Sequence, residues 1–237
     1  MQPAPVALTH GRMRFVVLFA CAVAVLGGAC TTFSPVRPLA PGTHAVAVTG
    51  GGPLANVPGV GTIPLPHVTV EGRHGIVERA DVHYGVHLLP LVFGVAGVHV
   101  GGAYQMNEQP EPFAPAITVG QRFYGFTNVI DPRKGRIDVW GLSQSDFTAS
   151  WNVLGDHIVY AGFTGYVPLN EPKLYLAPFA GTQIVPGVDF LRVQLEARWV
   201  APYVDQRFAV VDWVSPGDKG GVLLNAGVAF LFGGGDP

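Results

Sequence analysis

Hydrophobic and polar residues alternate along most of this chain beyond residue 43, which is the pattern of β-strands with one apolar face. The clearest alternation covers residues 191–199, where Leu191 and Leu195 share one face and Arg192 and Arg198 share the other. No segment after residue 29 shows a sustained helical period, so we expect no helix there. Ten segments separated by turn residues are predicted to be strands: 44–50, 66–74, 79–90, 94–106, 115–127, 136–150, 157–168, 173–184, 190–201 and 221–232.

The last of these segments carries a resemblance to a known family. Asn225, Gly227, Phe230 and Phe232 resemble the closing-strand signal of bacterial outer-membrane β-barrel proteins, in which a polar residue is followed by glycine and then by a hydrophobic and a final aromatic residue. Proteins of that family usually end at the aromatic residue, whereas this chain continues to Pro237. The resemblance implies a small outer-membrane barrel, with the barrel-assembly machinery and the lipids of that membrane as partners.

The composition also favours a membrane barrel. Charged residues make up 13% of the chain, about half the usual share of a soluble globular protein. Beyond the N-terminal region no apolar run approaches the roughly 20 residues of a membrane helix, so strands that face lipid would have to bury this apolar surface. The sequence therefore predicts an all-β protein with an antiparallel up-and-down transmembrane β-barrel of about 10 strands, within a range of about 8–12. Because a soluble sheet shows the same alternation, a lipid-anchored periplasmic β-sandwich or lipocalin-like binding protein is the alternative.

The first thirty residues have the features of an export signal. Arg12 and Arg14 precede an apolar run of about a dozen residues that ends at Leu26. The small residues that follow end in Cys30, and this ending resembles a bacterial lipoprotein signal, in which the cysteine receives a lipid such as palmitate. The resemblance implies an exported outer-membrane protein anchored through Cys30. Leu26 stands one place further from the cysteine than the family pattern prefers, so simple cleavage near Ala29 is the alternative. We expect three regions: a lipoprotein-type signal peptide (1–29), a Pro-rich tether (30–43) and the barrel domain (44–237).

The bilayer determines which face of each strand points inward. An arginine that faces lipid at the bilayer midplane costs about 2–4 kcal/mol, so the charged faces are expected to line the lumen and the apolar faces to contact lipid. His83 and His87 are about 13 Å apart along a strand, too far to hold one metal ion together, but pairing between strands can bring His99 to one of them. No metal or cofactor is predicted. The predicted lumen residues are Asp81, His83, His87, His99, Arg192, Gln194, Glu196 and Arg198.

The sequence contains no motif that defines a catalytic site. Only one cluster could supply the serine, histidine and acidic residues of a lipid-modifying barrel enzyme, and no Gly-x-Ser-x-Gly motif accompanies it. The net charge of −2 and the lack of a basic stripe argue against a nucleic-acid partner. We predict a non-catalytic outer-membrane lipoprotein with a structural, surface-binding or small-solute pore role and an unknown ligand; an outer-membrane lipid-modifying enzyme is a second alternative. The cluster considered for such an enzyme is Ser143, Ser145, Ser150, Asp146 and His157.

Overall fold

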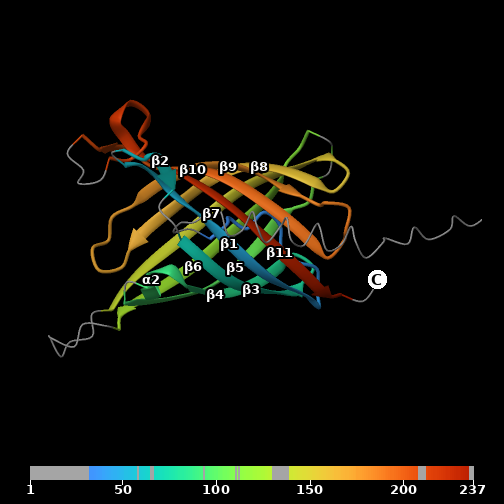
Figure 1. Ribbon diagram of the computed structural model, residues 1–237. Coiled ribbons are helices and arrows are strands. Elements are labelled where there is room, and N and C mark those ends of the chain that lie inside the picture. Colours follow the sequence, from blue (N-terminus) through green and yellow to red (C-terminus); the bar gives the residue numbers. More distant parts are fainter. Residues whose placement is uncertain are drawn as a thin grey trace, which may run out of the picture.

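Ten antiparallel strands form a closed barrel (Figure 1). The computed structural model describes residues 32–57, 59–64, 67–92, 94–109, 111, 113–129, 139–207 and 212–234. The barrel strands are β1 (Thr43–Val57), β3 (His67–Val77), β4 (Ala80–His87), β5 (Val95–Asn107), β6 (Ala116–Asn128), β7 (Val139–Leu154), β8 (His157–Pro168), β9 (Tyr175–Ile184), β10 (Leu191–Asp205) and β11 (Lys219–Gly233).

Each barrel strand pairs with the next one along the chain, and the last strand pairs with the first. The β1–β11 pairing runs from Thr43↔Gly233 to Pro53↔Leu223, while β3 pairs with the other edge of β1. All ten predicted segments coincide with barrel strands, so the predicted antiparallel barrel is confirmed. A closed barrel is not a sandwich, and the β-sandwich alternative is therefore wrong.

One end of the barrel carries a hairpin that was not predicted. β1 extends beyond the barrel and pairs with β2 (Gly61–Pro64), starting at Leu54↔Pro64. Ala55 in this hairpin forms an isolated bridge with Trp213 in the connection between β10 and β11. The two long connections at this end are thus joined to each other.

The prediction of no helix after the signal peptide needs a small correction. The described parts of the connections contain one short α-helix, α2 (Leu89–Val92), and one 3-10 turn, η1 (Pro216–Asp218). Each has a proline in its first turn, where the fixed φ of proline suits a helix. Both segments are too short to produce a helical period in the sequence.

Within the part of the chain that the structure describes, no helix has the length and apolar character needed to cross a membrane.

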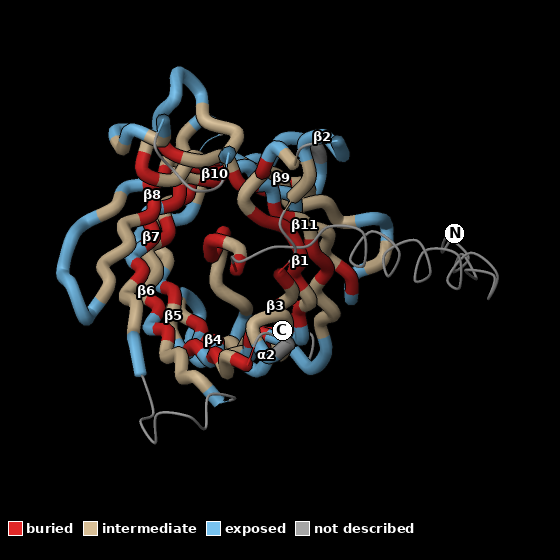
Figure 2. Tube along the Cα trace, turned by 60° about the vertical axis from the view of Figure 1, so that its left-hand side comes forward, coloured by how far each residue is buried: buried red, intermediate tan, exposed pale blue. Residues whose placement is uncertain are grey.

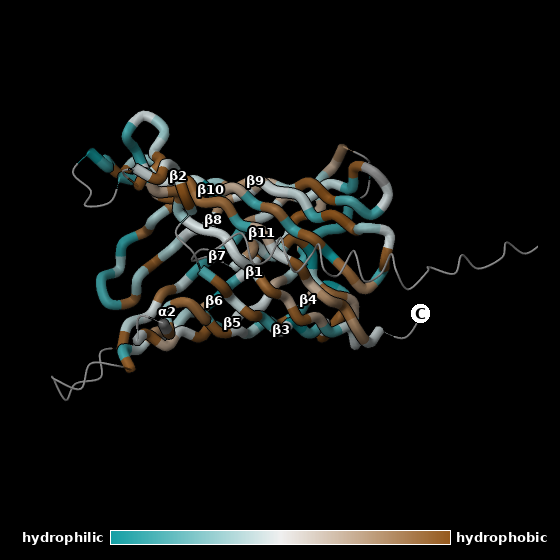
Figure 3. Tube along the Cα trace, viewed as in Figure 1, coloured by the Kyte–Doolittle hydropathy of each residue, from teal (hydrophilic) through white to brown (hydrophobic). Residues whose placement is uncertain are grey.

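The barrel is apolar outside and polar inside. Tyr84 on β4 and Phe163 on β8 are exposed on the outer surface, whereas Asp81 and Thr164 on the same strands are buried inside. Figure 3 shows hydrophobic and hydrophilic residues alternating along the strands. This arrangement suits a barrel surrounded by lipid. It does not suit a lipocalin-like barrel, whose outer surface faces water.

Two apolar residues, Leu191 and Val228, depart from the expected lipid-facing surface because both are buried. Leu195 is exposed on the outside of β10, but Leu191 at the start of the strand is buried and packs against Val228 and Val188. The connection before β10 covers this position, because its Val188 side chain packs against the cluster. The outer apolar face of β10 therefore begins after Leu191.

The chain before β1 runs inside the barrel. Residues 32–40, here called the lumen segment, lie within the ring of strands in Figure 2, and Thr32, Ser34 and Val36 are buried. This segment belongs to the stretch 30–43 that the sequence analysis assigns to a tether. Cys30 and the signal peptide lie outside the described residues.

Candidate functional site in the lumen

The lumen segment is bound to β10 on one wall of the barrel. Ser34 N–H donates to Glu196 Oε2 at 3.2 Å, and Arg198 Nη2 donates to Ser34 Oγ at 2.7 Å. Glu196 and Arg198 form an ion pair at 2.6 Å, and both side chains are fully buried. The Tyr160 hydroxyl of β8 also donates to Glu196, at 3.3 Å. Each buried charge therefore has both an opposite charge and hydrogen bonds, which offset the cost of burying it, although Arg198 Nε has no hydrogen-bond partner among the described residues.

The same segment is bound to β6 on another wall. Arg122 donates to the Thr32 hydroxyl and, at 3.3 Å, to Phe33 O. The Thr32 hydroxyl also lies 2.8 Å from the Tyr124 hydroxyl. Arg122 in turn pairs with Glu71 of β3 at 3.2 Å. The end of the lumen segment farthest from β1 is thus held by a guanidinium that has its own carboxylate partner.

Further contacts fix the segment closer to β1. Leu39 N–H donates to Asp81 Oδ2 of β4 at 3.1 Å. The Arg37 guanidinium donates to Ser150 Oγ at 3.2 Å and to Asn152 Oδ1 at 3.0 Å, both on β7. Residues 32–40 therefore contact β4, β6, β7 and β10, so the segment crosses the lumen instead of following one wall.

Two glycines on the inner surface give the segment room. A β-carbon on Gly120 would lie 2.5 Å from Pro35 Cγ, and one on Gly227 would lie 2.6 Å from the Phe33 ring. A packed interior does not accommodate such contacts without movement. Gly227 belongs to the predicted closing-strand signal, and its contact with the lumen segment is a role that sequence reasoning missed.

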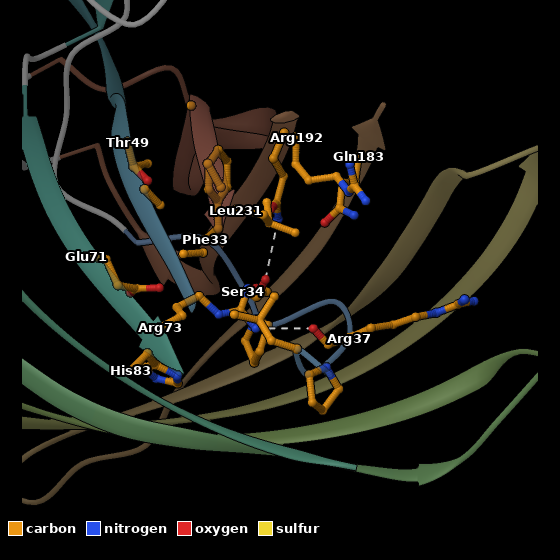
Figure 4. A pocket seen from close by; sticks show the side chains of 18 of the residues that line it. Phe33, Ser34, Arg37, Thr49, Glu71, Arg73, His83, Gln183, Arg192 and Leu231 are labelled. Carbon is orange, nitrogen blue, oxygen red and sulfur yellow. Dashed lines mark hydrogen bonds between the residues drawn. The ribbon is translucent and has the colours of Figure 1, made fainter. Parts of the chain in front are cut away.

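Two cavities flank the layer in which Arg122 and Tyr124 hold the segment. The first cavity, of about 360 Å³, lies at the end of the barrel where β1 begins, and Figure 4 shows Glu71, Arg73 and Arg192 around it. The second cavity, of about 340 Å³, lies toward the opposite end of the lumen. Its inward-facing lining includes His67, His87, Tyr124, Gln144, Tyr166 and Leu223.

The structure places the eight predicted lumen residues on the inner faces of β4, β5 and β10. His87 and His99 lie together, 3.2 Å apart between ring nitrogens, whereas His83 lies 4.0 Å from the Asp81 carboxylate. Gln194 donates to the Tyr160 hydroxyl at 2.8 Å. Six of the eight are buried (Asp81, His83, His87, His99, Glu196 and Arg198), and two are half-buried (Arg192 and Gln194).

Sequence reasoning missed the lumen residues of β3 and β6. Glu71 and Arg73 on β3 and Arg122 on β6 face inward and make the contacts described above. A signal for them was present, because Glu71 and Arg73 alternate with Val70 and Gly72 in the same way as the charged face of β10. Assigning faces to every strand would have found them.

The cluster considered for a lipid-modifying enzyme is not brought together. Ser143 and Ser145 lie on the outer face of β7 and hydrogen-bond with Gln121 at 2.9 and 2.6 Å. Ser150 and Asp146 are buried on the inner face of the same strand. Among the described residues, no group of histidine, cysteine or acidic side chains is arranged to hold a metal ion.

The closing strand has the two faces that the sequence pattern indicated. Asn225 is buried on the inner side of β11, and Phe232 is exposed on the outer side. β11 pairs with β10 as well as β1, so it closes the barrel. A role of this strand in recognition by the assembly machinery stays a prediction.

No protein-family model matches this sequence, and no curated protein matches it. Solved structures of similar fold include a porin and an autotransporter domain. The NanC porin is 12% identical over 78% of this chain and 98% of that chain, with a TM-score of 0.42. The translocator domain of the autotransporter NalP from Neisseria meningitidis is 9% identical over 94% of this chain and 97% of that chain, with a TM-score of 0.41.

The barrel itself defines the class of protein. Its closed antiparallel sheet of ten strands, apolar exterior and polar lumen are the features of a small outer-membrane β-barrel. The even strand number is the rule for single-chain bacterial barrels.

Proposed function

We propose that this protein is a small-solute pore of the bacterial outer membrane, closed by its own lumen segment when Cys30 carries no lipid. The observation that carries the proposal is the set of hydrogen bonds by which residues 32–40 cross the lumen to β4, β6, β7 and β10. Polar side chains on both sides of the segment suit hydrated solutes, while the segment itself blocks their path. The proposed role is non-catalytic, requires no cofactor and leaves the solute unnamed.

The contacts of the lumen segment suit a closure that can be reversed. A hydrogen bond contributes only about 0.5–1.5 kcal/mol net, because water can replace the lost partner. Water entering an opened lumen would replace the partners of Ser34, Thr32 and Arg37. Val36 is the apolar anchor, in a small cluster with Ile158 and Phe179. The segment is therefore held mainly by bonds that solvent can exchange.

Gly120→Val tests the closure. The added side chain would meet Pro35 of the lumen segment, whereas the next nearest wall atom is Asp146 Cβ at 3.6 Å. We expect the mature chain (30–237), refolded without lipid and inserted into planar bilayers, to be mostly silent and the variant to conduct. Gly125→Val is the matched control, since a β-carbon there meets nothing within 4 Å, and it should stay silent.

A second measurement separates displacement from conduction. A single cysteine at Val36, in a Cys30→Ala background, should be protected from a water-soluble maleimide and become reactive when Gly120→Val is added. Equal conductance of the unaltered protein and Gly120→Val would contradict the closure. A variant that exposes position 36 and still fails to conduct would contradict the pore.

Lipid anchoring through Cys30 is a further part of the proposal, and Thr32 limits where the lipid can lie. Two residues span at most about 7 Å, and Thr32 is buried in the lumen beside Tyr124. The closure proposed above is therefore that of the chain without the lipid, and we expect a lipid on Cys30 to draw the lumen segment out and open the lumen. Radioactive palmitate should label the unaltered protein in cells, and label on the Cys30→Ala protein would show that Cys30 is not the site.

Insertion through the closing strand is the last part of the proposal. The motif from Asn225 to Phe232 would be recognised by the barrel-assembly machinery, and outer-membrane lipids would surround the finished barrel. Deleting residues 230–237 should prevent accumulation in the outer membrane, whereas deleting residues 233–237 should not. Equal insertion of both truncated chains would show that the motif from Asn225 to Phe232 is not the signal that the assembly machinery recognises.

A further inference from the structure

Three buried histidines form a continuous row on the wall made by β3, β4 and β5. His67 Nε2 lies 2.7 Å from His87 Nδ1, and His87 Nε2 lies 3.2 Å from His99 Nδ1. His99 Nε2 donates to Glu71 Oε2 at 3.0 Å. Each ring thus contacts the next through a nitrogen, and the row ends on a carboxylate.

A single set of neutral tautomers satisfies every bond in the row. Glu71 accepts, so His99 carries its proton on Nε2 and accepts on Nδ1. His87 must then donate from Nε2 and accept on Nδ1, and His67 must donate from Nε2. All three rings therefore have the same tautomer, and the row has one direction, from His67 to Glu71.

The strand register creates this row by placing a glycine between its last two members. Glu71 on β3 pairs with Gly85 on β4, and Gly85 pairs with His99 on β5. A β-carbon on Gly85 would lie 2.5 Å from His99 Cε1. Because Gly85 has no side chain, His99 reaches across β4 to Glu71.

The row connects the two cavities of the lumen. His67 and His87 line the second cavity, and Glu71 lines the first. His99 lies between them and lines neither. The same layer of the barrel contains the contacts of Thr32 with Arg122 and Tyr124, which block the lumen. The histidine row therefore passes the blockage along the inner surface of the barrel wall.

The geometry suits proton transfer and not metal binding. His87 uses its two nitrogens for two neighbours on opposite sides, so the three rings do not converge on one point. An imidazole can accept a proton on one nitrogen while releasing one from the other. The charged groups beside the row are Arg122, which pairs with Glu71, and the Asp81 carboxylate near His83.

We propose that this row conducts protons between the two cavities while the lumen segment blocks larger solutes. A proton that binds His67 allows its Nε2–H to pass to His87, the proton of His87 to pass to His99, and that of His99 to pass to Glu71. One proton enters and one leaves Glu71 for water in the first cavity. The rings end as Nδ1–H tautomers, and ring rotation restores the starting tautomers. The inference rests on the closure proposed above, because an open lumen would let protons pass through water.

Proton flux into vesicles tests the relay. The mature chain is refolded into vesicles that contain a pH-sensitive dye, with potassium and valinomycin on both sides to balance charge. We expect an imposed pH gradient to decay faster than in protein-free vesicles, and His99→Gln to lose this excess flux. His87→Gln removes the preceding link and should give the same loss. His83→Gln is the matched control, because His83 is buried on β4 outside the row, and it should keep the flux.

Two further readouts keep the relay and the closure separable. Chloride efflux from the same vesicles reports on closure alone, so rapid efflux from the unaltered protein would contradict the closure. The relay is then decided by nitrogen NMR of labelled histidines, which should show three neutral Nε2–H tautomers. Charged rings, Nδ1–H tautomers, or an undiminished flux in folded His99→Gln protein would overturn the relay.

Discussion

The two walls that surround the lumen segment use charge in different ways. On β10, Glu196 and Arg198 form a fully buried ion pair whose members both bind Ser34. On β3 to β5, a carboxylate receives a row of imidazoles, each of which can accept a proton on one ring nitrogen and release one from the other. An arginine keeps its charge at any ordinary pH. The comparison indicates that the β10 wall serves to hold the segment, whereas the β3–β5 wall can also carry protons.

Both walls nevertheless depend on the same backbone device. Gly181 on β9 stands between Tyr160 and Glu196 in the register, as Gly85 stands between Glu71 and His99. A glycine on the middle strand lets side chains of the two outer strands meet above it. The walls therefore differ in the chemistry of the meeting residues and not in how they are brought together.

Removing one member of the β10 ion pair should have the largest effect. Arg198→Ala leaves the Glu196 carboxylate buried without its partner, and such a loss destabilises a protein by about 3–5 kcal/mol. The free energy of unfolding in urea, measured in lipid vesicles, checks this value. Arg192→Ala is the control on the same face of β10, because Arg192 is half-buried and donates to backbone carbonyls. Equal losses in the two variants would show that the buried pair does not dominate this wall.

A charge placed on the opposite, outer face of β10 should have the next largest effect on stability. Leu195→Arg places a charge on the exposed outer surface and should destabilise the inserted barrel by about 2–4 kcal/mol near the midplane. Gln194→Arg should cost less, because Glu196 lies two residues along the same inner face. Unfolding in vesicles measures both. A larger loss for Gln194→Arg would mean that the outer surface of this strand does not contact lipid.

The barrel could be predicted because its pattern depends on local alternation and on the difference between a lipid-facing surface, where charge is costly, and a polar lumen. Every second residue shares a face, and charge facing lipid is costly, so Arg192 and Arg198 had to point inward. The exceptions are Leu191 and Val228, which alternate correctly but are buried together beside Val188 of the connection before β10. Alternation alone does not reveal such a cover.

The contacts within the lumen could not be predicted, because they depend on stagger between distant strands. Glu71 meets Arg122 and Ser34 meets Glu196 across long stretches of sequence, and no local signal fixes those pairings. The lumen segment is rich in proline and lacks alternation, so its composition resembles that of a linker. The segment is buried because polar groups and glycines on the surrounding strands accept it, and the sequence of the segment itself gives no information about those partners.

Adding a side chain at Gly85, in the β3–β5 wall, should lower the stability of the barrel by a moderate amount. Gly85→Ala places a methyl group 2.5 Å from His99 Cε1 and from Val70 O, and overpacking of this kind costs about 1–3 kcal/mol. We expect the same variant to lose proton flux, because His99 is pushed away from Glu71. Unfolding and flux are measured on the same preparation. Loss of stability without loss of proton flux would show that proton transfer does not need the space beside Gly85.

The smallest effects should come from single hydroxyls of the lumen segment, one for each wall. Ser34→Ala removes the acceptor of Arg198 and leaves the Ser34 N–H bond to Glu196 in place. Thr32→Val removes the partner of Arg122 and Tyr124. Each change should weaken closure by about 0.5–1.5 kcal/mol, which is about a two- to thirteenfold rise in the open fraction of single-channel recordings.

The two variants also show from which wall the lumen segment is released first. Arg198 keeps Glu196 as a partner when the Ser34 hydroxyl is lost, and Arg122 keeps Glu71 when the Thr32 hydroxyl is lost. Since both guanidiniums stay paired, neither variant should lower the stability of the barrel, and only the open fraction should change. Thr32 is farther from β1, so its release can free the end of the segment while Leu39 stays bound to Asp81. We therefore expect Thr32→Val to open the lumen more often than Ser34→Ala. The reverse order would indicate that the β10 wall, and not the β6 wall, limits opening.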